Sequence, residues 1–161
     1  MKMLKRFNVK KNERGLIYSE GDFVAILEPG IHRHFDLHNR LSVETFSLNS
    51  PLFEHRLAGY LRQSEPALVE RYFISMDVGS DEVGLRYEDD QLVEILAPGT
   101  RRLYWKGQAG QRLERIDFSE HYRLAPELVA RFNQPAQRGR VIAGLDAVLM
   151  VQVPAYPVSY T

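Results

Sequence analysis

Four side chains of types that bind divalent metals recur at every second position of one short segment. They are His32, His34, Asp36 and His38. Alternate residues of a β-strand project from the same face, so the first three would form one row. Imidazole and carboxylate groups suit zinc or nickel. The segment gives an alternative function, a small metal- or ligand-binding protein that uses the loop of His32, His34 and His38; the favoured interpretation is that these histidines serve no ligand.

A second group carries residue types that hydrolases use. Ser119, Glu120 and His121 are adjacent, but a nucleophile, a base and an orienting acid must converge on one substrate, which neighbours in sequence seldom do. The chain has no Cys, no Gly-x-Ser-x-Gly, no His-Glu-x-x-His and no P-loop. Glu13 and Glu82 are equivalent carboxylates that we expect on separate turns. We predict no enzyme activity and no cofactor.

Composition narrows the class of protein. The chain has 161 residues and a mass of 18.6 kDa, enough for one domain or two small ones. Lys and Arg number 21, and so do Asp and Glu, which gives a pI near 7.0. A dedicated nucleic-acid-binding protein would be basic, so we predict no nucleic-acid partner. No apolar run approaches the ~20 residues of a membrane span and no signal peptide is evident, so we expect a cytoplasmic location.

An internal repeat organises the chain. Glu13–Phe35 aligns without gaps on Glu82–Tyr104, 69 positions later, with ten identities in 23 positions. Past a one-residue insertion the match continues, because Val43–Leu48 resembles Leu113–Phe118. Self-similarity at a fixed period is the sequence signature of tandem structural units.

Later segments extend this repeat. Pro66–Tyr72 resembles Pro126–Phe132, and Val151, Val158 and Tyr160 resemble the beginning of a third unit. The chain is therefore expected to be a piece of a longer protein. Its expected parts are a first β-repeat with helices (1–72), a second β-repeat with a short helix (73–134), and a linker with the first strand of a third repeat (135–161).

Each unit has the pattern of antiparallel strands joined by tight turns. In the first unit, β-prone runs at 15–18, 23–27, 31–35 and 41–48 alternate with polar turn clusters, and the second unit repeats them. Pro-Gly pairs supply a fixed φ followed by a residue free to take positive φ, as type II turns require. The residues expected to define the turns are Gly15, Pro29, Gly30, Gly84, Pro98 and Gly99.

The connecting segments are expected to be helical. Pro66 suits the first position of a short helix, and Glu54-His55 reads as a solvated helix face. Apolar residues recur at helical spacing at Leu52, Phe53, Leu57, Tyr60 and Leu61. The predicted fold class is α+β, mainly β: two tandem antiparallel β-meander repeats with short connecting helices and the start of a third repeat.

The repeated phrase resembles a known family. A turn followed by Val-x-Ile-Leu-x-Pro-Gly and a strand with Arg and an aromatic residue is similar to the N-terminal region of bacterial slipins, in the stomatin/prohibitin/flotillin superfamily. The residues concerned are 13–18 with 24–35, and 82–87 with 93–105. The resemblance implies a scaffold or protein-interaction module of a larger assembly, associated with membrane microdomains in the full-length protein. The β-repeats of vault-type shell proteins are a weaker second resemblance.

Two features of stomatin-like proteins have no counterpart in this sequence. They are the N-terminal hydrophobic anchor and the long C-terminal helix that drives oligomerisation. Membrane anchoring and ring assembly are therefore not implied for this chain. The expected partner is protein, either a second copy or another subunit. The segment Val148–Tyr160 is a candidate contact, because a strand without the rest of its unit leaves backbone donors and acceptors unpaired. We expect it either to pair with the first unit beside Phe7–Val9 or to form a dimer across a two-fold axis.

The N-terminus is basic, with six Lys and Arg residues against one Glu up to Arg14. Such a stretch could make weak contact with the inner, anionic face of a membrane; the alternative is a basic strand edge that discourages aggregation. The residues proposed for membrane contact are Lys2, Lys5, Arg6, Lys10 and Lys11. A groove for a carbohydrate or peptide lined by Tyr60, Tyr72, Tyr104 and Tyr122 is equally compatible with core packing.

Overall fold

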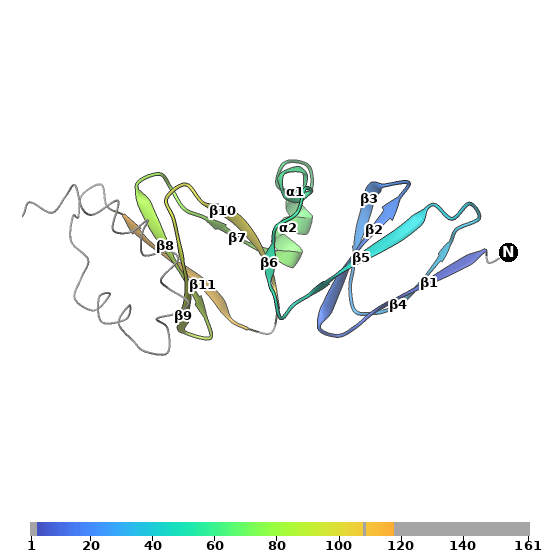
Figure 1. Ribbon diagram of the computed structural model, residues 1–161, viewed down its shortest axis with the longest axis horizontal. Coiled ribbons are helices and arrows are strands. Elements are labelled where there is room, and N and C mark those ends of the chain that lie inside the picture. Colours follow the sequence, from blue (N-terminus) through green and yellow to red (C-terminus); the bar gives the residue numbers. More distant parts are fainter. Residues whose placement is uncertain (1–2, 108, 118–161) are drawn as a thin grey trace, which may run out of the picture. The chain divides into compact units, whose positions relative to one another are not determined.

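The computed structural model describes residues 3–107 and 109–117, which form two compact units (Figure 1). The first unit comprises residues 3–73 and 105–107, and the second comprises 74–104 and 109–117. The elements up to residue 72 are β1 (Leu4–Val9), β2 (Glu13–Ser19), β3 (Asp22–Leu27), β4 (Gly30–Phe35), β5 (Leu41–Ser47), β6 (Leu52–Phe53), α1 (Ala58–Ser64) and α2 (Pro66–Tyr72). Those after it are β7 (Phe73–Asp77), β8 (Glu82–Glu88), β9 (Gln91–Leu96), β10 (Arg101–Trp105) and β11 (Gln111–Asp117).

The sheets confirm the predicted mainly β class with antiparallel, meander-like pairs and two short helices. In the first unit the strand order is β3-β2-β5, and β4 leaves this sheet to pair with β1. In the second unit the order is β9-β8-β11, and β10 lies beside β7. Each unit thus combines a three-stranded sheet with a separate strand pair; β1–β4 is a two-stranded ribbon, whereas in the pair β7–β10 the strand β10 also borders β6.

Both units share the same register, which confirms that the sequence repeat is a structural one. Gly15 pairs with Leu27 and Gly84 with Leu96, and each hairpin shifts register at the same place, after Ile17 and after Arg86. Even the turns before β2 and β8 match. There the carboxylate of Glu13 accepts a hydrogen bond from the Lys10 N–H, and that of Glu82 accepts one from the Gly79 N–H. As expected, these two carboxylates lie on separate, equivalent turns.

The one-residue insertion lies in the Pro-Gly turn of the second unit, earlier than the sequence alignment put it. Val9 pairs with Gly30, whereas the Val78 N–H donates to the carbonyl of Thr100, which is 70 positions after Gly30. Gly99 has φ 76° in a turn closed by the Thr100 N–H, while Gly30 has φ 140° and already begins β4. Along β4 and β10 the structurally equivalent residues are therefore 70 apart.

Gly15 and Gly84 lie inside β2 and β8, so their predicted assignment to turns was wrong. Their role is to let a neighbouring strand approach closely. A Cβ on Gly84 would lie 2.7 Å from the Val78 side chain, and one on Gly15 would lie 3.2 Å from the Val9 side chain. The contact at Gly84 leaves no space for a larger residue, and at Gly15 the neighbouring side chains would have to shift slightly.

The segment after β5 differs from its prediction. Leu52 and Phe53 form the short strand β6 instead of the start of a helix, and α1 begins only at Ala58. The helical spacing of the apolar residues was misleading because a strand and a helix share that stretch. Pro66 does begin α2, as predicted. Glu54 is exposed, but His55 is not on a helix face, because it precedes α1 and packs against aromatic rings.

The core of the first unit lies between its ribbon and its sheet. Val9, Ile17 and Leu27 are buried there, and the apolar residues packed around them are Phe7, Ala25, Leu41 and Val43. The predictions for Ser119–His121, Tyr122, Pro126–Phe132 and Val148–Tyr160 fall outside the described residues.

A Gly84→Ala substitution should destabilise the chain by about 2 kcal/mol, because the added methyl group overpacks a filled site. Gly15→Ala should cost less, since its contacts are longer. Urea unfolding measures both. Gly59→Ala in α1 is the control; nothing lies within 4 Å of its Cβ position, so it should be neutral or stabilising. Equal effects of all three substitutions would contradict the assigned close approach.

Candidate functional site

The ribbon β1–β4 has one face toward the core and one toward solvent. Because side chains alternate across a strand, Lys5, Phe7 and Val9 of β1 face inward, as do His32 and His34 of β4. The outward face holds three cross-strand pairs. They are Leu4 with Phe35, Arg6 with Arg33, and Asn8 with Ile31.

Large exposed apolar side chains concentrate on this ribbon. Among the described residues seven such side chains are exposed, and five of them lie on β1, on β4 or directly beside these strands. Those five are Met3, Leu4, Ile31, Phe35 and Leu37. A concentration of exposed apolar side chains on one element is characteristic of interaction sites.

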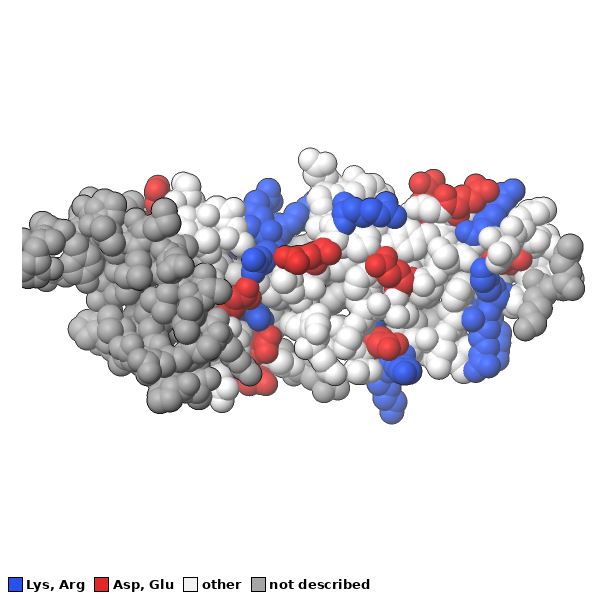
Figure 2. All heavy atoms as spheres, in the orientation of Figure 1, with Lys and Arg blue, Asp and Glu red and all other residues white. Residues whose placement is uncertain are grey.

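Two like charges face each other in the middle of the outward face. Arg6 and Arg33 are directly opposite, and neither guanidinium has a hydrogen-bond or ion-pair partner within residues 3–107 and 109–117. Like charges at opposed positions destabilise a strand pair. On the face shown in Figure 2, basic side chains gather in a column over the β1–β4 end of the first unit. An acidic group placed there would be favoured.

The outer edge of β4 offers backbone hydrogen bonds. The Asp36 N–H donates to the Met3 carbonyl at 2.8 Å, so the next pair, Leu4 with Phe35, is of the type that does not exchange hydrogen bonds. The N–H and C=O groups of Ile31, Arg33 and Phe35 therefore point away from β1. Within the described part of the chain β4 has no other strand neighbour.

The strand pair β7–β10 contains the counterpart of the Leu4–Phe35 pair, and there the two side chains are buried. The Lys106 N–H donates to the Tyr72 carbonyl as Asp36 does to Met3, which makes Phe73 and Trp105 the counterparts of Leu4 and Phe35. Phe73 and Trp105 are 2% and 1% exposed, against 52% for Leu4 and 68% for Phe35.

The cover on Phe73 and Trp105 comes from the segment that leads into β6. The Pro51 carbonyl accepts a hydrogen bond from the Trp105 N–H at 2.7 Å. The Phe53 ring lies 4.9 Å from Phe73 and 5.3 Å from Trp105, with Phe46 beside them. One added strand thus supplies both the backbone partner and the aromatic cap.

The three histidines proposed as ligands do not come together. His32 Nε2 lies 2.7 Å from the Glu28 carbonyl oxygen, and the His34 ring lies 6.2 Å from that of Phe7. His38 is in the exposed turn after β4. In the part of the chain that the structure describes, no group of three or more His, Asp or Glu side chains is placed to hold a metal ion.

Asp36 organises the turn after β4 instead of continuing the histidine row. Its carboxylate accepts hydrogen bonds from the N–H groups of Arg40 and Leu41, at 2.7 and 3.0 Å, and lies 3.6 Å from Lys5 Nζ. Burial opposes ionisation, but the two backbone hydrogen bonds and the Lys5 charge outweigh it and lower the pKa of Asp36. Of the basic residues proposed for membrane contact, Lys5 is therefore engaged in a turn, while Arg6, Lys10 and Lys11 are exposed.

A small polar cluster of the first unit was missed in the sequence. The Tyr18 hydroxyl donates to Glu44 at 2.9 Å, and His55 Nε2 lies 3.0 Å from the same carboxylate oxygen. His55 Nδ1 accepts the Leu57 N–H, so Nε2 carries the proton toward Glu44. Burial and the hydrogen bond to Glu44 raise the pKa of Tyr18 to about 12. The phenol therefore remains a donor, and the cluster joins β5 to the segment before α1.

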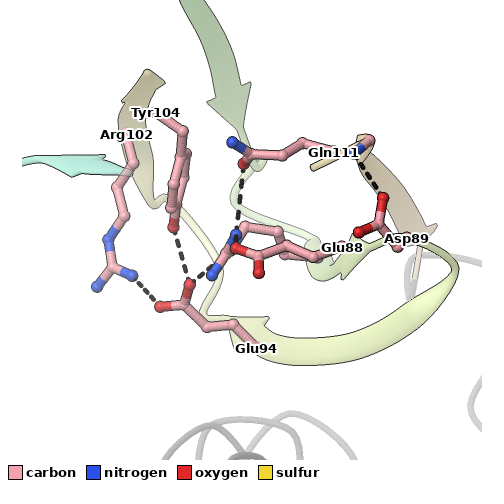
Figure 3. A network of polar contacts seen from close by, with 8 residues as sticks. Glu88, Asp89, Glu94, Arg102, Tyr104 and Gln111 are labelled. Carbon is pink, nitrogen blue, oxygen red and sulfur yellow. Dashed lines mark hydrogen bonds and ion pairs between the residues drawn. The ribbon is translucent and has the colours of Figure 1, made fainter. Parts of the chain in front are cut away.

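The second unit holds a larger network around the buried Arg86. Figure 3 shows Arg102 and the Tyr104 hydroxyl of this network pointing toward Glu94. Arg86 donates to Glu94 at 2.9 Å and to Glu88 at 2.6 Å, and its guanidinium lies 4.5 Å from the centre of the Tyr104 ring. Glu94 also accepts from Arg102 and from the Tyr104 hydroxyl. Burial opposes the charge of Arg86, but the hydrogen bonds to both carboxylates raise its pKa.

This network is structural. Arg86 pairs with Glu94 across β8 and β9 where the first unit pairs Ile17 with Ala25. A cross-strand ion pair thus replaces an apolar pair, and its charges offset one another. The signal was present in the repeat alignment as two substitutions of opposite charge at paired positions.

The burial and contacts of the described tyrosines do not support the groove that the sequence left open as one interpretation. Tyr72 is buried and its hydroxyl reaches Glu28, and Tyr104 is buried in the Glu94 network. Tyr60 is exposed and lies edge-on to Phe23, with ring centres 6.3 Å apart. Of the tyrosines named for this groove, these three have separate packing roles.

Comparison with known proteins adds no relative. No protein-family model matches the chain, and neither the curated proteins nor the solved structures contain a match. Within the described residues no helix is long and apolar enough to cross a membrane. The similarity to slipins remains a prediction from the sequence.

The Arg86–Glu94 pair can be exchanged for its counterpart in the first unit. Glu94→Ala alone should destabilise the chain by about 3 kcal/mol, because it leaves Arg86 and Arg102 short of a carboxylate. Adding Arg86→Ile should recover most of that loss, since it recreates the Ile17–Ala25 combination. Urea unfolding of the two single variants and the double variant measures the coupling. Additive losses would show that the pair does not act as a unit.

Asp36→Asn should destabilise the chain at neutral pH and progressively less in acid. The stabilisation by the carboxylate is complete above its ordinary pKa of 3.8 and is lost as the pH falls through the lowered pKa of the folded chain. Thermal unfolding of both proteins from pH 7 to pH 3 checks the sign. A difference that stayed constant or grew in acid would contradict the turn-organising role.

Proposed function

We propose that this chain is a non-enzymatic scaffold or protein-interaction module. Its binding surface is the outward face of the β1–β4 ribbon with the outer edge of β4. The observation that carries the proposal is the contrast between two equivalent positions. Leu4 and Phe35 are exposed, whereas Phe73 and Trp105 are covered by a strand that also binds the Trp105 N–H.

The mode of binding that fits this surface is strand addition. An extended segment placed beside β4 would satisfy the N–H and C=O groups of Ile31, Arg33 and Phe35. Its side chains would meet an apolar pair, two arginines and a second apolar residue in order along the ribbon. The preferred ligand is therefore an extended peptide with an acidic residue between two apolar ones, at alternate positions.

The resemblance to slipins supports a wider setting for this module. By that likeness it would belong to a longer scaffold protein in the cytoplasm, at the inner face of the membrane and associated with membrane microdomains. Arg6, Lys10 and Lys11 are exposed and basic, which favours weak contact with anionic lipid. Lys5 would contribute less, because it is held by Asn39 and the Leu41 carbonyl.

Peptide selection against the purified chain tests the function. We expect recovered peptides to be extended and to carry the apolar–acidic–apolar pattern. Their affinity should fall about tenfold for a Phe35→Ser variant, since an aromatic anchor is removed. Val24→Ser is the matched control, because Val24 is a similarly exposed apolar residue of the same unit on β3. Recovery of no peptide, or of peptides indifferent to Phe35→Ser, would contradict the proposal.

A further inference from the structure

The chain has a second segment at the place in the repeat from which the cover on Trp105 comes. The cover on Trp105 belongs to the stretch that follows β5, which runs through Pro51 and β6 and then into the Pro66-led α2. The stretch that follows β11 begins with Phe118 and continues to Pro126–Phe132, whose sequence resembles Pro66–Tyr72. By its place in the repeat, residues 118–132 correspond to 48–72, but the part before Pro126 has 8 residues where the part before Pro66 has 18, so no residue of it aligns with Phe53.

The sequence of this segment matches the open ribbon in period and in charge. Phe118, Glu120 and Tyr122 are at alternate positions, so in an extended strand they would share one face. The outward face of the ribbon presents the Leu4–Phe35 pair, then Arg6 with Arg33, then Ile31, also at alternate positions. An aromatic–acidic–aromatic row would therefore set its carboxylate against the two opposed arginines.

We propose that residues 118–132 of one copy of the chain add as a strand to the outer edge of β4 of a second copy. This inference rests on the proposed function and names its partner. The contact joins two different surfaces, so it is heterologous and would build head-to-tail chains or closed rings. The Glu120 carboxylate would lie beside Arg33 and offset one of the two positive charges of Arg6 and Arg33, and the Phe35 N–H would gain the backbone partner that Trp105 finds in Pro51.

Charge reversal in the full chain provides the test. Sedimentation velocity over a concentration series should show association of the unmodified chain. Arg33→Glu should weaken it about tenfold or more, and Glu120→Arg likewise, because each places like charges together. The double variant Arg33→Glu with Glu120→Arg should recover most of the association, since it restores an opposite pair. Lys11→Glu, a charge reversal on an exposed residue of the same unit outside the ribbon face, should leave association unchanged.

A synthetic peptide of residues 117–132 provides the second arm. It should bind the full chain and dissociate the assembly, and binding should be lost with Phe35→Ser but kept with Val24→Ser. An unmodified chain that stays monomeric at every concentration and ignores the peptide would overturn the proposal. So would association that persists in both single charge-reversal variants.

The two proposals fail separately. If selected peptides bind through Phe35 while the chain neither self-associates nor binds its own peptide, the interaction function stands and the second copy is the wrong partner. If neither the selected peptides nor the peptide of residues 117–132 depends on Phe35, both proposals are overturned.

Discussion

A close contact between a valine side chain and a glycine within the neighbouring strand determines which strand faces point to the core in each unit. Val78 approaches Gly84 at a distance that excludes a Cβ on the glycine, and Val9 approaches Gly15 almost as closely. Because side chains alternate along a strand, this one contact determines which residues of β1 and β4 face the core. It also determines what remains outside, namely an apolar pair, two opposed arginines and an exposed isoleucine.

The strand pairs β1–β4 and β7–β10 have the same hydrogen-bonding geometry but differ in what covers them. In β7–β10, Phe53 packs on Phe73 and Trp105, and the Pro51 carbonyl accepts a hydrogen bond from the outward-pointing Trp105 N–H. In β1–β4, Leu4 and Phe35 are exposed, and within the described residues β4 has no strand neighbour other than β1. The cover on Phe73 and Trp105 is therefore the basis of our proposal that Leu4 and Phe35 receive an extended strand that brings an aromatic side chain.

Sequence reasoning found the repeat, the strands β2–β5 and β8–β11, and Pro66 at the start of α2, because these depend on local turn chemistry and period; it did not predict the strands β6 and β7. It did not find that β4 pairs with β1, since that pairing is a long-range contact. It also matched Arg33 with Arg102 by identity, although the insertion in the Pro-Gly turn places Arg33 outside and aligns Arg102 with His32. A shift of one residue exchanges the two faces of a strand, so the outward face could be recognised only from hydrogen bonds.

The open edge of β4 can be examined directly by amide hydrogen exchange measured by NMR on the dilute full chain. The Trp105 N–H, bonded to Pro51, should be strongly protected, and the Phe35 and Arg33 N–H groups should exchange rapidly. The His34 N–H, which points toward β1, is the internal reference for an intact ribbon and should be protected. Protection of Phe35 equal to that of Trp105 in a monomeric sample would mean that the edge is already covered within its own chain, and would contradict an open binding surface.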